Sequence, residues 1–166
     1  MRNLSVYGFL TTFVAAFSVL FVSAGAAARA PEIFMQGGGF FGSAWEYAID
    51  GHDAVAYYSL EEGAAPVPGD DAFVTTYKGE KWRFSSQENL DAFEADPARY
   101  APQYGGYCAW AVAENKLAKG APAHWHIHNG KLYLNVNARI KKKWLSDIEG
   151  YLARSEENWP GILDRN

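Results

Sequence analysis

Residues 124–135 read His-Trp-His-Ile-His-Asn-Gly-Lys-Leu-Tyr-Leu-Asn, and this stretch decides the fold class more clearly than any other. Apolar and polar residues alternate on both sides of Asn129-Gly130, a dipeptide typical of two-residue type I′ turns. Alternation with a period of two indicates a half-buried β-strand. We therefore expect a β-hairpin, and its two-residue turn sets the pairs His128–Lys131, His126–Tyr133 and His124–Asn135.

A second hairpin is expected upstream, because residues 73–77 and 81–84 alternate about Lys78-Gly79-Glu80. Helices are expected around the hairpins. Their signals are a capping box at Ser85 and Glu88, an Asp96-Pro97 cap, a helix from Gly106 to Ala113, and a final helical region capped by Asn137 with a break at Gly150. No internal repeat is visible, and nothing suggests βαβ units. The pattern predicts a small α+β domain of two hairpins interleaved with short helices.

The N-terminal residues indicate export. Residues 4–28 carry no charge and end in small residues, as a signal peptide does before its cleavage site. We assign residues 1–30 to a signal peptide, with an uncleaved membrane anchor as the alternative, because the run is long enough to span a bilayer. Residues 31–44 are a Gly-rich linker and residues 45–163 one domain. The expected location is the periplasm or the extracellular space, or the membrane surface if the segment is retained.

The charge distribution excludes a large class of partners. The formal net charge is −4, and Lys141 to Lys143 form the single basic cluster, on an expected helix. Nucleic-acid binding requires a concentrated basic face, so no nucleic-acid partner is expected. Membrane contact is expected only through the N-terminal segment. A metal ion or a redox partner protein remains a candidate partner, and the oligomeric state is not predicted.

Cys108 is the single cysteine of a chain bound for an oxidising compartment. If a helix begins at Gly106, its free backbone N–H groups would lower the thiol pKa and favour both nucleophilicity and metal ligation. The alternative is simple packing, because Tyr107, Ala109 and Trp110 are core-like neighbours and free cysteine is often buried. Both interpretations stay open.

The histidines form the second candidate group. In the expected hairpin Trp125 and Ile127 face the core, so His124, His126 and His128 share the other face, where i and i+2 imidazoles can approach one ion. Lys131 opposite His128 would oppose an ion there by about 1 kcal/mol, so His128 is the weakest of the three. His124 and His126 are therefore candidate metal ligands, and His52, beside the capping residue Asp53, is a further candidate partner of Cys108. The alternative is the polar face of an ordinary hairpin.

Several ordered motifs over residues 47–163 resemble the exported YHS-domain proteins. These motifs are Gly51-His52-Asp53-Ala54-Val55-Ala56-Tyr57-Tyr58, Tyr77-Lys78-Gly79-Glu80-Lys81-Trp82-Arg83-Phe84-Ser85, Asp96-Pro97-Ala98-Arg99-Tyr100 and Tyr104-Gly105-Gly106-Tyr107-Cys108-Ala109. Related modules carry metal-binding cysteines that align with Ala56, Ser85 and Asn89, so the resemblance does not carry that metal site to this chain. Some relatives of the exported branch are labelled selenoproteins, which implies redox chemistry at Cys108.

Two functions therefore stand beside an interaction domain without chemistry. The first is a periplasmic module that binds copper or zinc through Cys108 with His124, His126 or His52, since thiolate and imidazole suit these ions. The second is a thiol oxidoreductase with Cys108 as the catalytic residue. The sequence favours a binding module over an enzyme, and a joint site requires the Cys108 sulfur within about 5 Å of an imidazole nitrogen.

Overall fold

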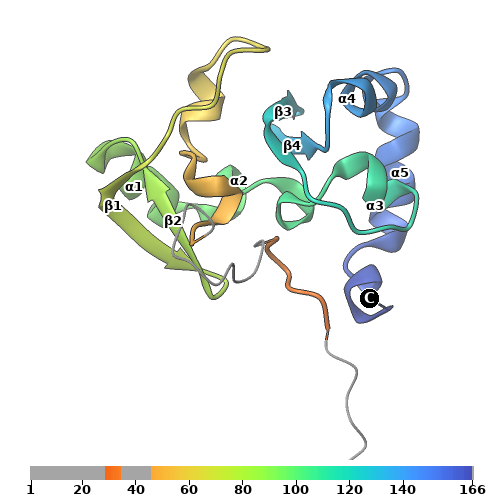
Figure 1. Cartoon of the computed structure of the whole chain (residues 1–166), viewed down its shortest axis with the longest axis horizontal. Coiled ribbons are helices and arrows are strands. Elements are labelled where there is room, and N and C mark those ends of the chain that lie inside the picture. Colours follow the sequence, from red (N-terminus) through yellow and green to blue (C-terminus); the bar gives the residue numbers. More distant parts are fainter. Residues whose placement is uncertain (1–28, 35–45, 166) are drawn as a thin grey trace, which may run out of the picture.

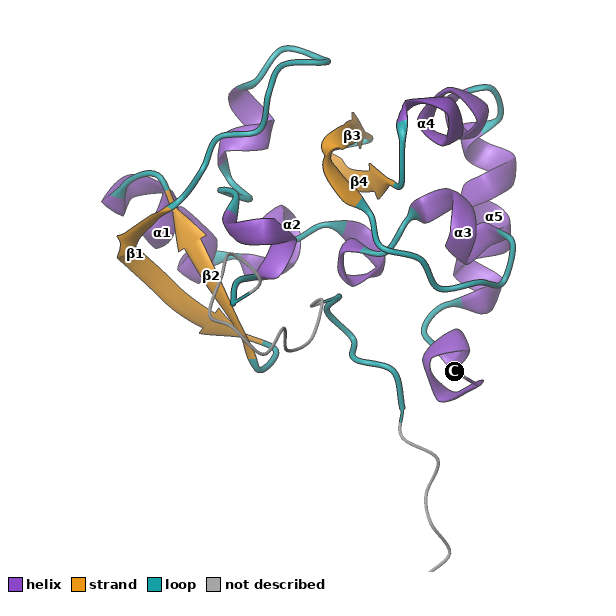
Figure 2. Ribbon diagram, in the orientation of Figure 1, coloured by secondary structure: helices purple, strands orange, loops and turns teal. Residues whose placement is uncertain are grey.

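The computed structural model describes residues 29–34 and 46–165, and these residues form two antiparallel hairpins with short helices around them (Figure 2). This is the α+β fold that the sequence predicts. Most of the expected signal segment (residues 1–30) and most of the expected linker lie outside the described residues, and only residues 29–34 of the two are described. Among the residues described, none of the helices has the length and apolar character that crossing a bilayer requires.

The elements follow one another in the order shown in Figure 1. In chain order they are η1 (Ala48–Gly51), η2 (Ala56–Ser59), β1 (Asp70–Tyr77), β2 (Glu80–Phe84), α1 (Gln87–Ala95), α2 (Pro97–Tyr100), η3 (Gln103–Gly106), α3 (Ala109–Ala113), β3 (Ala121–His128), β4 (Lys131–Asn135), α4 (Ala138–Leu145), α5 (Ile148–Asn158) and η4 (Gly161–Arg165), where η marks a 3-10 helix.

Helix boundaries differ from the sequence expectation at three places. Ser86, not Ser85, caps α1, because the Ser86 side chain accepts from Asn89 N–H. The break between α4 and α5 falls at Asp147, whose carboxylate caps α5, while Gly150 lies inside that helix. The helix expected from Gly106 begins later, because Gly106 ends the 3-10 turn η3 and α3 starts only at Ala109. The caps at Asp96 and Asn137 are confirmed.

The two halves of the described chain repeat one arrangement. β1 begins at Asp70 and β3 at Ala121, 51 residues later. Both hairpins share an irregularity, because the register shifts between Asp70 and Val74 in one and between Ala121 and Trp125 in the other. Two successive helices follow each hairpin, α1 and α2 in the first half and α4 and α5 in the second.

The first unit (residues 47–100) and the second unit (residues 102–158) also open on equivalent turns. Each turn contains three successive residues with positive φ, at 49–51 and at 104–106. Its last glycine then accepts a backbone N–H from the glycine before the hairpin, Gly69 to Gly51 and Gly120 to Gly106. The domain is thus a structural repeat, and the expectation of a chain without internal repeats is wrong at this level.

The second hairpin lies between two apolar clusters. One of its faces contributes Trp125, Leu132 and Leu134 to a core shared with the first unit, while Tyr133 points into a core formed with α4 and α5. Rings dominate both cores, and fully buried rings contribute about 1.5–3 kcal/mol each. The buried aromatic residues are Tyr57, Trp82, Phe84, Phe93 and Trp125 in the first core and Tyr104, Tyr107, Tyr133, Trp144 and Tyr151 in the second.

Residues 29–34, which we call the strap, pack against both units (Figure 1). Ala30 N–H donates to the Leu163 carbonyl at 2.9 Å, and Phe34 N–H donates to the Gly105 carbonyl at 2.8 Å. Ile33 is only 4% exposed. Residues 31–34, which the sequence assigns to a flexible linker, are therefore part of the packed domain.

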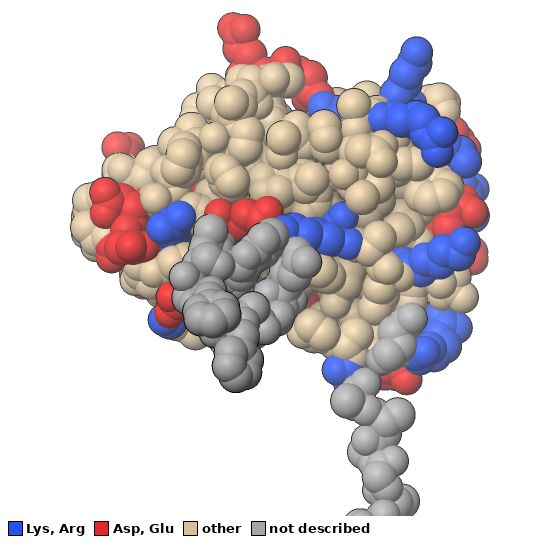
Figure 3. Space-filling view, viewed as in Figure 1, with Lys and Arg blue, Asp and Glu red and all other residues tan. Residues whose placement is uncertain are grey.

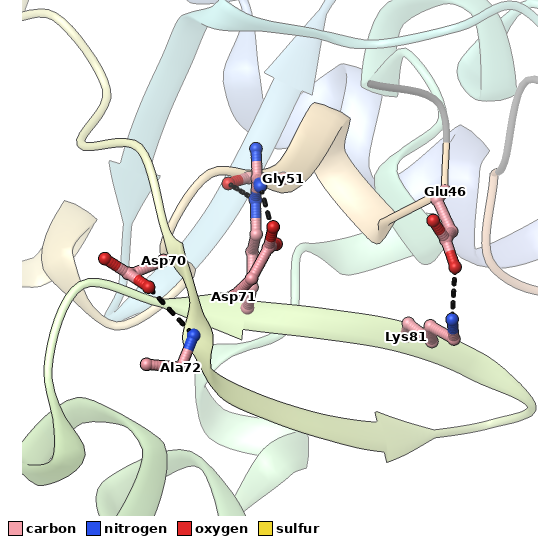
Figure 4. Close-up of polar contacts among 7 residues, drawn as sticks. Glu46, Gly51, Asp70, Asp71, Ala72 and Lys81 are labelled. Atoms are coloured by element: carbon pink, nitrogen blue, oxygen red, sulfur yellow. Dashed lines mark hydrogen bonds and ion pairs between the residues drawn. The ribbon is translucent and has the colours of Figure 1, made fainter. Parts of the chain in front are cut away.

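Arg83 on β2 fixes the opening turn of the first unit (Figure 4). Its Nε donates to the Gly51 carbonyl at 3.0 Å and its Nη1 to Asp71 at 2.9 Å, while the guanidinium covers the Tyr47 ring. A Cβ at Gly51 would lie 2.5 Å from the Arg83 Nε, and Gly51 also has φ +72°, so glycine is required here. Lys81 on the same strand pairs with Glu46.

Candidate functional site

Cys108 lies at the entrance of α3 as its N-cap, one residue before the first turn in which the sequence placed it. Its side chain has no exposed surface and packs against Ala111 and Ile140. The thiol donates to Asn135 Oδ1, at 3.6 Å. Cys108 is thus buried in a largely apolar cluster, with Asn135 as its polar neighbour, and is not presented to solvent.

Burial raises the pKa of the Cys108 thiol. Backbone N–H groups of Ala111, Val136 and Trp110 oppose this effect and hold the pKa lower than burial alone would. The net direction is opposite to the low thiol pKa that the sequence expects. N–H groups directed at the sulfur favour an anion over a metal cation, which needs the sulfur lone pairs for itself.

The structure separates Cys108 from the histidines of the second hairpin. Cys108 bridges to Leu134 on one edge of β4, and Trp125 of β3 pairs with the same residue on the other edge. Two strand spacings, about 10 Å, therefore lie between Cys108 and β3. The joint Cys–His site is not formed, and no group of three His, Cys, Asp or Glu side chains that could hold a metal occurs within the described residues.

His52 remains a turn residue. Its Nδ1 lies 3.0 Å from the Ile49 carbonyl, and its backbone forms a bridge with Pro68. Both contacts stay within the first unit. Within the described residues His52 and Cys108 belong to no group of three ligand-type side chains that could hold a metal.

The register of the second hairpin confirms two of the three expected pairs. His128 pairs with Lys131 and His126 with Tyr133, but Asn135 pairs with Ala121 instead of His124. The register shift between Ala121 and Trp125 causes this difference, because extra residues in one strand break the strict alternation. His124 therefore lies in the irregular part of β3, away from the paired positions.

His126 and His128 come together. Their ring centroids are 6.4 Å apart with an interplanar angle of 23°, and both side chains are about one fifth exposed, at 21% and 23%. His126 Nδ1 lies 3.0 Å from Glu62 Oε2, and His128 Nε2 lies 2.8 Å from Glu149 Oε1. Each imidazole thus has one nitrogen against a carboxylate. Glu62 lies in the loop after η2, and Glu149 lies in α5.

Neighbouring charges support this arrangement. Burial alone would raise the pKa of Glu62, but hydrogen bonds from Lys141 and His126 outweigh it, so the pKa of Glu62 lies below its usual range. Glu62 is therefore ionised at neutral pH. His126 also meets the edge of the Trp144 ring at 6.0 Å, which limits the positions its own ring can take.

Asp53 has a larger structural role than the helix cap that the sequence predicts. It was expected only as a helix cap, yet its carboxylate is fully buried and accepts five hydrogen bonds. Oδ1 accepts from the N–H groups of Val55 and Ala56, and Oδ2 accepts from Ser85 N–H, Ser85 Oγ and Asn89 Nδ2, at 2.6–3.1 Å.

The partners of Asp53 occupy the three positions at which the resemblance to related modules would place cysteines. Ala56, Ser85 and Asn89 all donate to this carboxylate, so hydrogen bonds join these three segments in this chain. Five donors fill the acceptor positions of Asp53, which leaves no room for a cation. The alignment of those positions was the signal that could have revealed the network.

Basic and acidic side chains are interspersed on the face shown in Figure 3. The largest basic group on this face lies over α4, whose last turn carries Lys142 and Lys143. Lys143 covers the Trp110 ring and Lys141 reaches Glu62, so part of this lysine run has structural contacts.

Comparison with known families gives one match. The family model described as the YHS domain matches residues 65–104, which contain β1, β2, α1 and α2 of the first unit. No curated protein and no solved structure matches the chain. The matched segment contains Ser85 and Asn89, which donate to Asp53, while Asp53 itself and most of the second unit lie outside the match. The chain therefore carries a match to the YHS domain at residues 65–104, about a quarter of its length.

Proposed function

We propose that this chain is an exported module that binds a transition metal, copper or zinc, and that its ligands are His126 and His128. The observation that carries the proposal is the pair of imidazoles on one face of β3, each with one nitrogen against a carboxylate. The YHS domain is consistent with a metal-binding module. Of the metal ligands that the sequence predicts, the proposal keeps only His126. It adds His128 and does not include Cys108, His124 or His52.

The carboxylates prepare the rings for a metal. A metal-binding histidine commonly donates its other ring N–H to a carboxylate, which fixes the tautomer and makes the ligating nitrogen more basic. Glu62 stands in this position toward His126 and Glu149 toward His128. The second nitrogen of each ring is then available to an ion that approaches from solvent.

The spacing lies at the upper limit for a shared ion. With metal–nitrogen bonds of about 2.1 Å and about 1.1 Å from nitrogen to ring centre, two ligating imidazoles reach centres about 6.4 Å apart only when their nitrogens lie on opposite sides of the ion. The observed separation is 6.4 Å, so a shared ion would bind in a nearly linear arrangement or draw the two rings closer together. Lys131, paired with His128, opposes the ion, but Glu62 and Glu149 provide two negative charges nearby. Water molecules would complete the coordination of such a two-histidine site.

The test is a competition titration of the metal-free protein with Cu(II) and Zn(II). We expect His126→Ala/His128→Ala to weaken binding at least tenfold. The matched control His52→Ala/His124→Ala, which also removes two imidazoles, should leave the affinity unchanged. Glu62→Gln should weaken it about 10-fold through the orientation of His126. An affinity unchanged in the first variant, or lost in Cys108→Ser, contradicts the proposal.

Export is the second element of the proposal and rests on the uncharged run of residues 4–28. We expect the mature protein to begin after Ala26 or Ala28, just before the strap. N-terminal sequencing of protein recovered from outside the cytoplasm checks this. Full-length protein that stays in the cytoplasm contradicts it.

A further inference from the structure

The repeat places Cys108 where the first unit has Asp53. Each residue lies two positions after the last glycine of its opening turn, Gly51 or Gly106. The backbone contacts agree, because Asp53 N–H donates to the Val67 carbonyl and Cys108 N–H donates to the Ala118 carbonyl, both at 2.8 Å. Val67 and Ala118 are themselves 51 residues apart, the offset of the two hairpins.

The surroundings of the two side chains also match. Asp53 accepts from the backbone N–H groups of Val55, Ala56 and Ser85. The corresponding residues of the second unit are Trp110, Ala111 and Val136. The same three backbone N–H groups hold the pKa of the Cys108 thiol lower than burial alone would. Trp110 N–H donates at 3.3 Å to Asn135 Oδ1, which also accepts from the thiol. The backbone positions that hold a carboxylate in one unit therefore lie near a thiol in the other.

Asn135 provides an independent sign that this site has unused donors. Its side chain is fully buried, and its Nδ2 has no hydrogen-bond partner. Its Oδ1 accepts from the Cys108 thiol and from Trp110 N–H, at 3.6 and 3.3 Å. A buried amide N–H₂ without an acceptor is unfavourable, because it has lost its hydrogen bonds to water. The site around Cys108 therefore contains a buried donor, Asn135 Nδ2, for which the neutral thiol provides no acceptor.

We propose that Cys108 is an oxidation site, and that its sulfinate takes the hydrogen bonds which the Asp53 carboxylate takes in the first unit. A sulfinate carries two oxygens and one negative charge, as a carboxylate does. Its oxygens can accept from the N–H groups of Trp110, Ala111 and Val136. A half-turn of the Asn135 amide then directs Nδ2 to one of these oxygens.

The oxidant is hydrogen peroxide, used twice. The thiol first releases its proton, and the thiolate attacks one peroxide oxygen, forms an S–O bond and breaks the O–O bond, which gives sulfenate and water. A second peroxide repeats this step, so one thiolate and two peroxides give one sulfinate and two waters, and the sulfur loses four electrons. Because the chain has no second cysteine, no disulfide within it can intercept the sulfenate. The burial of the sulfur makes the reaction slow and dependent on local opening.

The first test treats the folded protein with graded hydrogen peroxide and follows mass and melting temperature together. We expect a gain of about 32 Da on the peptide that contains Cys108, with little further gain to sulfonate. The melting temperature of the oxidised protein should rise by a few degrees, and Asn135→Leu should reduce this rise. A thiol that stays reduced through prolonged incubation just below the melting temperature, where local opening is frequent, or a melting temperature that falls on oxidation, overturns the proposal.

The second test does not depend on access to the sulfur. Cys108→Asp places a carboxylate in the site, and Cys108→Asn places a neutral group of the same shape. We expect the Asp variant to melt at or above the temperature of the Asn variant at pH 7, although an unprepared buried site strongly disfavours a charge. An Asp variant that melts well below the Asn variant, or fails to fold while the Asn variant folds, shows that the site does not hold an anion.

Discussion

At the scale of single residues, Asp53 shows how a buried carboxyl group is held by hydrogen bonds. Five N–H and O–H donors from Val55, Ala56, Ser85 and Asn89 surround its carboxylate. Charge-assisted hydrogen bonds of this kind are stronger than neutral ones, and the donors belong to segments far apart in the chain. Asp53 therefore ties the loop before η2 to the junction of β2 and α1.

Removal of the Asp53 carboxylate should destabilise the fold. In Asp53→Ala the donors of Ser85 and Asn89 and two backbone N–H groups lose their acceptor, and we expect a loss of about 2–4 kcal/mol in the free energy of unfolding. Urea denaturation measures this loss. The control is Asp91→Ala, because Asp91 is exposed and accepts only from Gln87, and its change should stay within about 0.5 kcal/mol. Equal effects of the two substitutions would show that the network around Asp53 contributes little.

For Cys108 and the histidines, the local sequence predicts the position of each residue but not whether their side chains meet. The sequence predicts correctly that Cys108 lies at a helix N-terminus and that His126 and His128 share a face. Whether Cys108 meets a histidine depends on which edge of β4 each segment occupies. No local pattern contains that information, because it is fixed by packing between segments distant in sequence.

At the scale of elements, the hairpins were predictable and their irregularities were not. Alternation and the turns at Lys78-Gly79 and Asn129-Gly130 act over neighbouring residues, so the strands could be assigned from the sequence. The register shift before Trp125 leaves no comparable pattern. It changed the position of His124, since a shift by one residue exchanges the two faces of a strand.

The glycine before each hairpin is required by close packing. A Cβ at Gly120 would lie 2.5 Å from both the Gly106 carbonyl oxygen and Leu134 Cβ, and a Cβ at Gly69 would lie 2.6 Å from the backbone of Arg83. These neighbours are backbone atoms or a Cβ, so they cannot rotate away. Gly120 and Gly69 thus have equivalent roles, because Arg83 and Leu134 are also 51 residues apart.

We expect Gly120→Ala to lower the free energy of unfolding by about 1–3 kcal/mol, and Gly69→Ala to behave in the same way. Chemical denaturation of the variants checks this. Gly161→Ala is the matched control, because a Cβ there meets nothing within 4 Å, and its effect should stay within about 0.5 kcal/mol. A stable Gly120→Ala protein would show that the approach of η3 to β4 is not tight in solution.

At the scale of the whole molecule, the domain consists of two similar units that share a core (Figure 1). The units have few identical residues at equivalent positions, and the contacts that repeat are largely backbone hydrogen bonds. Backbone contacts place weak demands on side chains, which is why the sequence alone suggests no repeat. The family match at residues 65–104 covers the hairpin and the two helices of the first unit.

The strap should contribute to stability as part of the core. We expect Ile33→Ala to lower the free energy of unfolding by about 2–4 kcal/mol, because Ile33 is buried in the core of the first unit. The neighbouring Glu32→Ala, which removes an exposed ion pair with Lys78, should cost less than about 1 kcal/mol. Both values come from urea denaturation of protein that retains residues 29–34. No difference between the variants would mean that the strap does not pack in solution.

The strap also brings the two ends of the described chain together. Ala30 is hydrogen-bonded to Leu163, and Arg29 forms an ion pair with Asp164 at 3.1 Å. The folded chain is therefore almost a closed ring, and a short peptide could join its ends without disturbing either core. New ends could then be opened near Gly63, in an exposed loop where a Cβ would meet nothing within 4 Å. In such a circular permutant the first hairpin, the second hairpin and then the strap would follow one another without interruption.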